Sequence, residues 1–237
     1  MLRLTPELLL AAYARGRFPM AGDRDDPNIH WIEPLRRGVL PLESFHVPRS
    51  LRKLVRKRPF ELKIDTAFGA VINACAEPTP DRPRTWLNDA LIDLYVVLHR
   101  RGHAHSVETW RDGRLVGGLY GLKLGGAFFG ESMFSRERDA SKVALVELVA
   151  RLRAGGFRLL DTQFVTEHLT RFGTVEITRG EYRRRLAAAL SAHAVFPTAP
   201  QPFYLGLLGP EAGGGGVPGA GGAGSGSGSA QPTTQTS

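Results

Sequence analysis

The sequence predicts an α/β fold, and the clearest sign is a helix between two short strands. The helix covers residues 139–154 and ends at Gly155-Gly156, because glycine adopts a left-handed conformation at no steric cost. Residues 127–133 before this helix and the apolar run 157–160 after it are expected to be strands. A strand–helix–strand unit therefore forms the predicted centre of the fold.

A β-hairpin is predicted just upstream of this unit. Residues 105–110 and 115–122 have strand character, and Asp112-Gly113 between them is a strong hairpin signal. Gly117 and Gly118 interrupt the second strand. Since glycine weakens a strand interior, we expect a bulge or a close backbone approach at this point.

The remaining elements follow from helix caps, glycine and proline breaks, and alternating apolar residues. Thr5 is the expected N-cap of a first helix, with Pro6 at its first position and Gly16 at its end. Further helices are predicted at residues 49–58, 68–76, 90–101, 166–172 and 179–194, and strands at residues 28–34, 39–42 and 60–64.

The composition indicates a globular protein with an anionic partner. The chain has 237 residues, enough to bury a core, and 42% of them are hydrophobic. The net charge of +8 favours a polyanion such as nucleic acid, although arginine-rich coding alone also raises the charge. Residues 209–237 are rich in Gly, Ala and Ser and are expected to be a disordered tail, because they bury too little apolar surface to offset the ordering entropy.

Cysteine and histidine content argue against two kinds of site. Cys75 is the only cysteine, which excludes an internal disulfide and a cysteine-based zinc site. His103 and His105 have no third ligand nearby, so no metal site is expected. The sequence contains neither a signal-peptide pattern nor an apolar run of the roughly 18 residues that span a bilayer. We therefore expect a cytoplasmic protein without membrane contact.

One predicted helix carries a basic face. Its basic residues recur at helical spacing and share one side, and they are Arg49, Arg52, Lys53, Arg56 and Lys57. Such a face suits contacts with phosphates. A solvated surface helix explains the same pattern.

Three polar residues are predicted to meet at one rim of the sheet. Glu131 lies at the end of one predicted strand, and Asp161 and Gln163 lie at the end of the next. Residues two apart on a strand face the same way, so the side chains of Asp161 and Gln163 are expected together. The alternative is structural, with the carboxylates capping helices or pairing with arginines such as Arg136.

The chain resembles the leucyl/phenylalanyl-tRNA–protein transferase family over roughly residues 4–204. The resemblance rests on an ordered set of segments, each of which would be weak alone. They are residues 12–19, Trp31, residues 42–50, 58–60, 67–69, 85–86, 102–108, 115–121, 130–136 and 161–163, and His168.

The resemblance implies both a fold and an activity. It implies a GNAT-like acyltransferase domain at residues 61–208, preceded by a small and shortened N-terminal α/β domain at residues 1–60. Members of this family move leucine or phenylalanine from Leu-tRNA or Phe-tRNA to proteins that begin with Arg or Lys, and the new N-terminus marks the product for degradation. Because the aminoacyl ester is already activated, no cofactor or metal is expected.

The resemblance also assigns residues to the reaction. It places Asp161, Gln163 and Glu131 at the reaction centre, with Glu131 holding the acceptor N-terminus. Trp86 is expected to stack on the terminal adenine. Trp31 belongs to the substrate-binding set, and a core role is the alternative. Many members carry Trp and Ser at the positions that Ile32 and Glu33 occupy in this chain. The implied amino-acid pocket consists of Leu119, Phe128, Met133, Leu145 and Leu160, for which a plain core role is the alternative.

Two other functions fit part of the pattern. An acyl-CoA-dependent N-acetyltransferase would have the same fold, but it requires a glycine-rich pyrophosphate loop that opens a helix, and residues 136–141, before Lys142, contain no glycine. A tRNA-binding protein without catalysis explains the charge. It gives no reason for Glu131, Asp161 and Gln163 to occur together in this setting.

Overall fold

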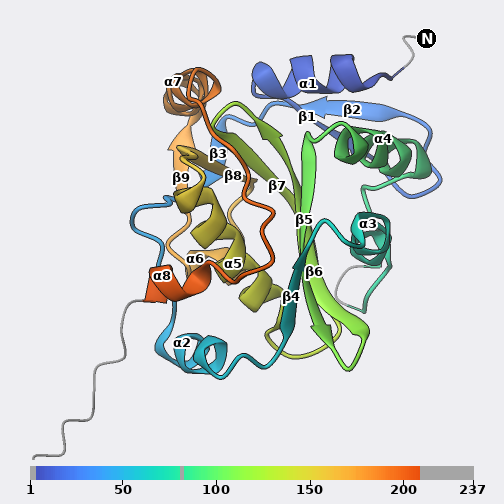
Figure 1. Ribbon diagram of the computed structural model, residues 1–237. Helices are drawn as coiled ribbons and strands as arrows, with labels where there is room; N and C mark the ends of the chain where they lie inside the picture. Colours follow the sequence, from blue (N-terminus) through green and yellow to red (C-terminus); the bar gives the residue numbers. More distant parts are fainter. Residues whose placement is uncertain (1–3, 81–82, 209–237) are drawn as a thin grey trace, which may run out of the picture.

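A seven-stranded mixed sheet organises the computed structural model, which describes residues 4–80 and 83–208 (Figure 1). All neighbouring strands are antiparallel except β7 and β8, which are parallel. In spatial order the strands are β4 (Glu61–Ile64), β5 (Ala104–Arg111), β6 (Arg114–Leu124), β7 (Ala127–Ser135), β8 (Leu159–Gln163), β3 (Arg36–Val39) and β9 (Val175–Thr178). A separate two-stranded sheet pairs β1 (Phe18–Ala21) with β2 (Ile29–Ile32).

The predicted strand–helix–strand unit is confirmed as β7, α5 (Ala140–Ala154) and β8. Helix α5 ends at Gly155, and Gly156 has a φ of +77°, the left-handed conformation that the glycine pair predicted. Strand β8 begins at Leu159, two residues later than expected. The parallel ladder runs from the pair Ala127–Leu159 to the pair Phe129–Asp161, while β7 continues to Ser135. The two strands therefore part just beyond Asp161.

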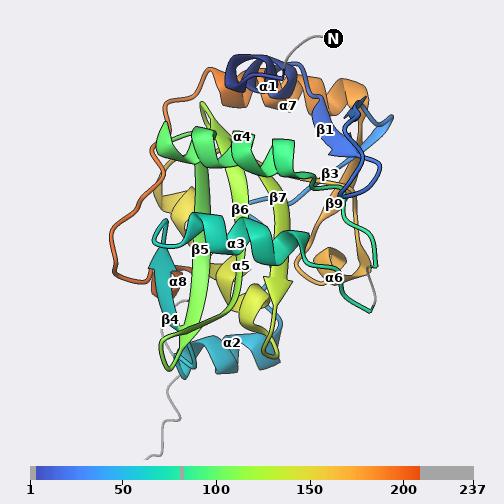
Figure 2. The same cartoon turned by 90° about the vertical axis from the view of Figure 1, so that its right-hand side faces the viewer.

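Helices cover both faces of the sheet (Figures 1 and 2). Helices α3 (Phe68–Ala76) and α4 (Asp89–Arg100) lie on one face, and α5 lies on the other, next to α2 (Arg49–Arg56) and α8 (Tyr204–Leu208). Helices α1 (Pro6–Ala14) and α7 (Arg179–Leu190) lie together across one end of the sheet (Figure 2), and the short α6 (Glu167–Thr170) follows β8.

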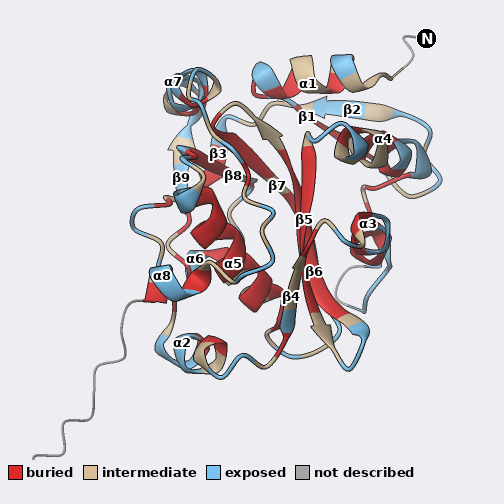
Figure 3. Cartoon of the chain, in the orientation of Figure 1, coloured by how far each residue is buried: buried red, intermediate tan, exposed pale blue. Residues whose placement is uncertain are grey.

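Each face of the sheet has its own apolar core. Leu145 and Leu160 belong to the core on the α5 side, and Tyr95 and Phe129 belong to the core under α3 and α4. Most of β5, the middle of β6 and the first part of β7 are buried on both sides, and Figure 3 shows these parts in red. Because a fully buried large apolar side chain contributes about 1.5–3 kcal/mol, these two cores supply most of the stability of the fold.

The close approach predicted at Gly117 is present. A Cβ atom on this residue would lie 2.5 Å from the Cβ atom of Ala140, the first residue of α5. A register shift between Thr109 and Trp110 of the facing strand marks an irregularity at the same place. Glycine is needed here because any side chain would push α5 away from the sheet.

Most predicted elements are confirmed, with differences at some bounds and three missed elements. Strand β3 begins at Arg36, earlier than the expected residues 39–42, and α7 ends at Leu190 rather than at residue 194. Strands β1 and β9 and helix α8 were not predicted. Three of the four residues of β9 are exposed, so the strand lacks the apolar alternation that marks a half-buried strand.

The expected domain division remains a prediction, but one segment bears on it. Residues 36–39 form a strand inside the seven-stranded sheet, between β8 and β9. Part of the expected N-terminal domain therefore shares a sheet with residues beyond 60. The glycine-rich segment 209–237 lies outside the described residues.

A buried ion pair on α5 binds the backbone of residues 197–204. Glu147 and Arg151 lie one helical turn apart, 2.7 Å separates their charged atoms, and neither side chain is exposed. The Glu147 carboxylate accepts the backbone N–H groups of Phe203 and Tyr204 at 3.0 Å. Arg151 donates to the backbone carbonyls of Pro197, Ala199 and Gln201 at 2.7–3.0 Å. The pair thus satisfies backbone groups of a segment that has no regular structure before α8.

Replacing Arg151 by Met should lower the free energy of unfolding by about 3–5 kcal/mol, because it leaves the Glu147 carboxylate buried without its cation. Urea denaturation would measure the loss. Arg153→Met, an exposed change on the same helix, is the control and should cost little. Equal losses in the two variants would contradict a stabilising role for the buried pair.

Candidate functional site

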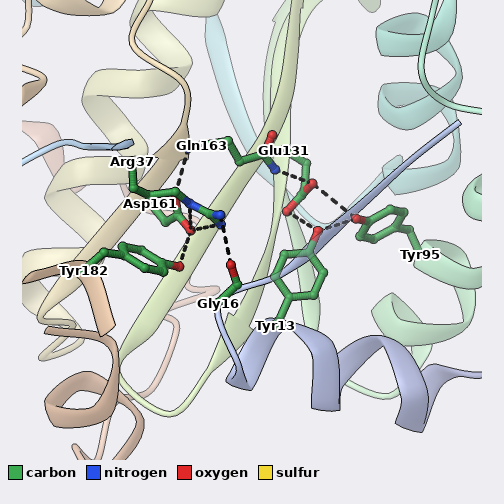
Figure 4. A network of polar contacts seen from close by, with 8 residues as sticks. All are labelled: Tyr13, Gly16, Arg37, Tyr95, Glu131, Asp161, Gln163 and Tyr182. Atoms are coloured by element: carbon green, nitrogen blue, oxygen red, sulfur yellow. Dashed lines mark hydrogen bonds and ion pairs between the residues drawn. The ribbon is translucent and has the colours of Figure 1, made fainter. Parts of the chain in front are cut away.

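Glu131 of β7 is the centre of a buried network (Figure 4). Its side chain is only 7% exposed and accepts three hydrogen bonds. The hydroxyl of Tyr13 on α1 donates at 2.6 Å, Gln163 Nε2 on β8 at 2.8 Å, and the hydroxyl of Tyr95 on α4 at 3.2 Å. The two tyrosine oxygens are themselves 2.6 Å apart. Four elements that are distant in the sequence thus converge on one carboxyl group.

Burial raises the pKa of Glu131 to about 7. The hydrogen bonds from Tyr13, Gln163 and Tyr95 oppose this shift, and the nearby charge of Asp161 adds to it. Burial first, and then the Glu131 charge, hold the pKa values of Tyr13 and Tyr95 well above the usual range, so both tyrosines stay protonated donors. Glu131 is therefore a buried acid that exchanges its proton near neutral pH.

Asp161 lies in a second, fully buried cluster beside the first. Arg37 of β3 binds it with two nitrogens: Nε lies 2.9 Å from Oδ1, and a terminal nitrogen lies 2.6 Å from Oδ2. The hydroxyl of Tyr182 on α7 donates to Oδ2 at 2.6 Å, and the backbone N–H of Gln163 donates to Oδ1 at 2.8 Å. Neither Asp161 nor Arg37 is more than 1% exposed. The carboxylate is held from several sides and does not reach solvent.

Asp161 and Gln163 do not act as a side-chain pair, contrary to the prediction from their spacing. Gln163 has a φ of +62°, which ends the strand alternation, and its side chain turns to Glu131 on β7. Asp161 turns to Arg37 on β3, the strand on the other side of β8. The two residues are joined only by the backbone N–H of Gln163. The alternative expected the carboxylates to pair with arginines such as Arg136. Asp161 does pair with an arginine, but it is Arg37, while Arg136 pairs with Glu77.

A cavity of about 510 Å³ opens where β7 and β8 part. Glu131 and Gln163 form part of its wall, and Asp161 does not. Most of the wall is apolar, and four of the five predicted pocket residues belong to it, together with Trp86 and two further leucines. The leucine and methionine residues of the wall are Leu119, Met133, Leu145, Leu148, Leu160 and Leu169, and Ala74, Phe134 and Phe164 also line it.

Two predicted substrate-binding residues lie away from this cavity. Phe128 faces the core on the α5 side, where its ring centroid is 5.6 Å from that of Phe196 and 6.2 Å from that of Phe157. Trp31 lies on β2, is 37% exposed and does not line the cavity. It is therefore not the core anchor that the alternative proposed.

The basic helix forms as predicted, as α2. All five of its predicted basic residues, Arg49, Arg52, Lys53, Arg56 and Lys57, line one surface groove together with His46 and Val47. This confirms that they share one face. Arg56 also donates to the backbone carbonyl of Leu208 at 3.3 Å, which ties α2 to α8.

Sequence reasoning missed four members of the buried network: Tyr13, Arg37, Tyr95 and Tyr182. Tyr13 lies inside a segment that resembles the family, but nothing in the sequence pairs it with Glu131. Arg37 is one of 31 basic residues and is 1% exposed, and no local pattern separates it from the solvated ones. Partners 118 and 124 residues away come together only through the tertiary fold.

Two kinds of feature are missing from the described part of the chain. Across residues 4–80 and 83–208, no group of three or more His, Cys, Asp or Glu side chains is placed to hold a metal ion. Within the same residues, no helix has the length and apolar character needed to cross a bilayer.

The cavity is mostly apolar, and a buried carboxyl group and an amide line part of it. Such a site suits an enzyme that acts on an apolar acyl group. Comparison with known proteins identifies such an enzyme. The chain belongs to the leucyl/phenylalanyl-tRNA–protein transferase family. The family model matches residues 39–187, and the model for the family's N-terminal domain matches residues 3–35. This confirms the family resemblance seen in the sequence.

Curated relatives match over most of the chain. A leucyl/phenylalanyl-tRNA–protein transferase from Paramagnetospirillum magneticum is 63% identical over 81% of this chain and 92% of its own length. One from Nitrobacter winogradskyi is 60% identical over 83% of this chain and 88% of its own. Among solved structures, the C-terminal domain of a putative lysylphosphatidylglycerol synthetase from Agrobacterium fabrum has a TM-score of 0.39 at 13% identity and covers 79% of this chain and 59% of its own.

The stability of the protein should depend on pH through Glu131. Its pKa is about 7 in the folded protein and about 4.5 when unfolded, so the folded state holds the proton more tightly between these values. The free energy of unfolding should fall as the pH rises through this window, by up to about 3 kcal/mol. Urea denaturation at pH 5, 6 and 7 would measure it.

In Glu131→Gln, which keeps the shape but cannot ionise, this part of the pH dependence should be absent. An identical pH profile for the wild type and the variant would show that Glu131 is ionised throughout.

Proposed function

We propose that the protein transfers leucine or phenylalanine from aminoacyl-tRNA to an acceptor protein whose first residue is Arg or Lys. The observation that carries the proposal is the apolar cavity that ends at Glu131 and Gln163. Its volume of about 510 Å³ accommodates a branched or aromatic side chain together with the reacting groups. The family membership and the relatives' names support the same reaction.

The chemistry asks little of the protein beyond positioning. The aminoacyl ester is activated already, so the acceptor amine needs only to be neutral and to lie about 3 Å from the ester carbonyl. Orientation of this kind supplies up to about 7–11 kcal/mol in favourable cases. Donors for the developing oxyanion lower the barrier further. A site without a cofactor meets these needs.

Two of the polar residues on the cavity wall, Glu131 and Gln163, suit two different tasks. Glu131 is acidic and lines the cavity beside apolar residues, so it attracts the acceptor's positive N-terminus. With a pKa of about 7, its carboxylate is also a suitable acceptor for the amine proton. Gln163 holds Glu131 through Nε2 and lies close enough to the same wall to align the ester. Asp161, which does not line the cavity, acts through Gln163.

The apolar wall is assigned to the transferred amino acid. Leu119, Leu145 and Leu160 provide a fixed surface, and Met133 is flexible enough to adapt to both leucine and phenylalanine. Trp86 on the same wall is assigned to the terminal adenine, a stacking contact of about 1–3 kcal/mol.

Helix α2 is assigned to the tRNA phosphates. Five basic side chains line one groove, and four of them, Arg49, Arg52, Lys53 and Lys57, are exposed. Such a row attracts a polyanion without reading its sequence.

A kinship with GNAT-like acyltransferases and a cytoplasmic role in marking proteins for degradation complete the proposal. The kinship is supported by the β7–α5–β8 unit, whose parallel strands part to leave room for an acyl group. The location is supported by the substrate, since aminoacyl-tRNA is a cytoplasmic molecule.

Radiolabelled leucine on Leu-tRNA should pass to a peptide that begins with Arg and not to the same peptide beginning with Ala. The reaction should need neither ATP nor CoA, because the ester bond supplies the free energy. Counting the label on the isolated peptide measures it. Binding of Leu-tRNA without label on either peptide would leave a binding protein, and label that requires acetyl-CoA would indicate the N-acetyltransferase.

Removing two charges from α2 should weaken tRNA binding and its dependence on salt. In Arg52→Ala/Lys53→Ala, the slope of log affinity against log salt should fall by about 2, or about 1 for each lost phosphate contact. Filter binding at several salt concentrations measures the slope. Arg100→Ala/Arg101→Ala, at the exposed end of α4, is the matched control. Equal slopes in all three proteins would remove α2 from the tRNA surface.

A further inference from the structure

The Arg37 guanidinium is buried and makes contacts on several sides. It is 1% exposed and lies between two aromatic rings, 4.5 Å from the ring centre of Phe18 and 4.6 Å from that of Tyr182. Besides its two contacts with Asp161, it donates to the backbone carbonyl of Gly16 at 3.1 Å. One side chain of β3 therefore contacts β8 and the turn after α1 (Figure 4).

The contact with Asp161 leads to Gln163. Asp161 Oδ1 accepts the Gln163 backbone N–H, and Gln163 has the left-handed φ of +62° that residues with a side chain rarely adopt. The chain also turns tightly against Gly38 of β3, where a Cβ atom would lie 2.8 Å from the Phe164 backbone carbon. Asp161 thus stabilises the backbone turn that points Gln163 Nε2 at Glu131.

The contact with Gly16 leads to Glu131 by a second route. Gly16 follows the last turn of α1, has a φ of +80°, and donates its N–H to the backbone carbonyl of Tyr13 at 2.9 Å. Tyr13 in turn donates its hydroxyl to Glu131. Both donors that lie within 3 Å of Glu131, Tyr13 and Gln163, are therefore tied to the same guanidinium.

We propose that Arg37 and Tyr182 are positioning residues that hold Gln163 and Tyr13 in place around Glu131, with Asp161 as the link to Gln163 and Gly16 as the link to Tyr13. Tyr182 completes the link because its hydroxyl binds the Asp161 oxygen that Gln163 leaves free, and its ring covers the guanidinium. Neither residue lines the cavity. The kinetic consequence rests on the proposed function, while the structural consequence does not.

A buried ion pair needs further hydrogen bonds to satisfy its remaining donors and lone pairs, and here the groups that supply them belong to the site. Apolar residues of similar volume often match the stability of such a pair. The particular value of a bidentate arginine is its fixed geometry, which locks the planes of the groups it binds. Here those groups are the two segments that carry the donors to Glu131.

Tyr182→Phe tests the proposal, since it removes one hydrogen bond and leaves the ring in place. We expect kcat for leucine transfer to fall about tenfold, with the KM for Leu-tRNA unchanged. This is the size of effect expected when one hydrogen bond to a charged group is lost. Tyr204→Phe, a buried tyrosine of α8 outside the cavity that ends at Glu131, is the matched control and should keep the wild-type kcat.

A double-mutant cycle separates positioning from general loosening of the fold. If Tyr182 acts through Gln163, then Tyr182→Phe should change kcat by less than about twofold once Gln163 has been replaced by Ala. A tenfold fall in both backgrounds, or no fall in the wild-type background, would overturn the proposal.

A crystal structure of Arg37→Lys gives a second readout that needs no activity. Lysine keeps the charge but not the two-nitrogen contact, so Gln163 should leave its left-handed conformation and Nε2 should move beyond 3.5 Å from Glu131. An unchanged Gln163 would overturn the proposal even where transfer is normal. If the wild type transfers no leucine, the proposed function fails, and this structure still decides the positioning role. Should this variant not fold, the crystal structure of Tyr182→Phe is read in the same way.

Discussion

The burial of two carboxyl groups where the parallel strands β7 and β8 part is the constraint on which the rest of the site depends. Asp161 and Glu131 both lose contact with water, which is costly unless each finds partners inside the protein. The fold provides two different solutions. Asp161 receives a cation and stays an ion pair, whereas Glu131 receives neutral donors only, so burial raises its pKa to about 7. Two carboxyl groups on neighbouring strands thus acquire different chemistry from their surroundings.

The cavity is a consequence of how the strands run. β7 and β8 pair over a short ladder and then separate, and α5, which connects them, covers the gap from one face. Apolar residues of β6, β7, β8 and α5 line the space, and the polar network closes it. The site therefore lies where the pairing between β7 and β8 stops. Gly117 allows α5 to lie close enough to the sheet to form part of the wall.

The arrangement suits a reaction in which the substrates bring their own activation. An activated ester needs alignment, a neutral nucleophile and a dry, shaped surface for its side chain, and it gains little from a strong base. The buried Arg37–Asp161 pair provides fixed geometry through its two-nitrogen contact. The proposed division of labour follows, in which buried charges hold the site and the residues on the cavity wall meet the substrates.

The sequence by itself determined most of the elements and the family. The glycine pair after residue 154, the Asp-Gly turn, the cap at Thr5 and the basic spacing of residues 49–57 act over a few residues, and all appear in the structure as expected. Local signals of this kind are readable because their physical cause is local. The same reasoning predicted that Glu131, Asp161 and Gln163 meet at one rim of the sheet.

Only the tertiary structure decided what those residues contact. Alternation along a strand placed Asp161 and Gln163 on one side, and a single positive φ separated them. Phe128 and Leu160 fit the same apolar pattern and both pack in the core, yet only Leu160 also lines the cavity. Arg37, Tyr13, Tyr95 and Tyr182 carry no signal in their own neighbourhoods, because their partners lie far away in the chain. Burial and long-range pairing belong to the packed molecule, and these two properties give each carboxyl group its role.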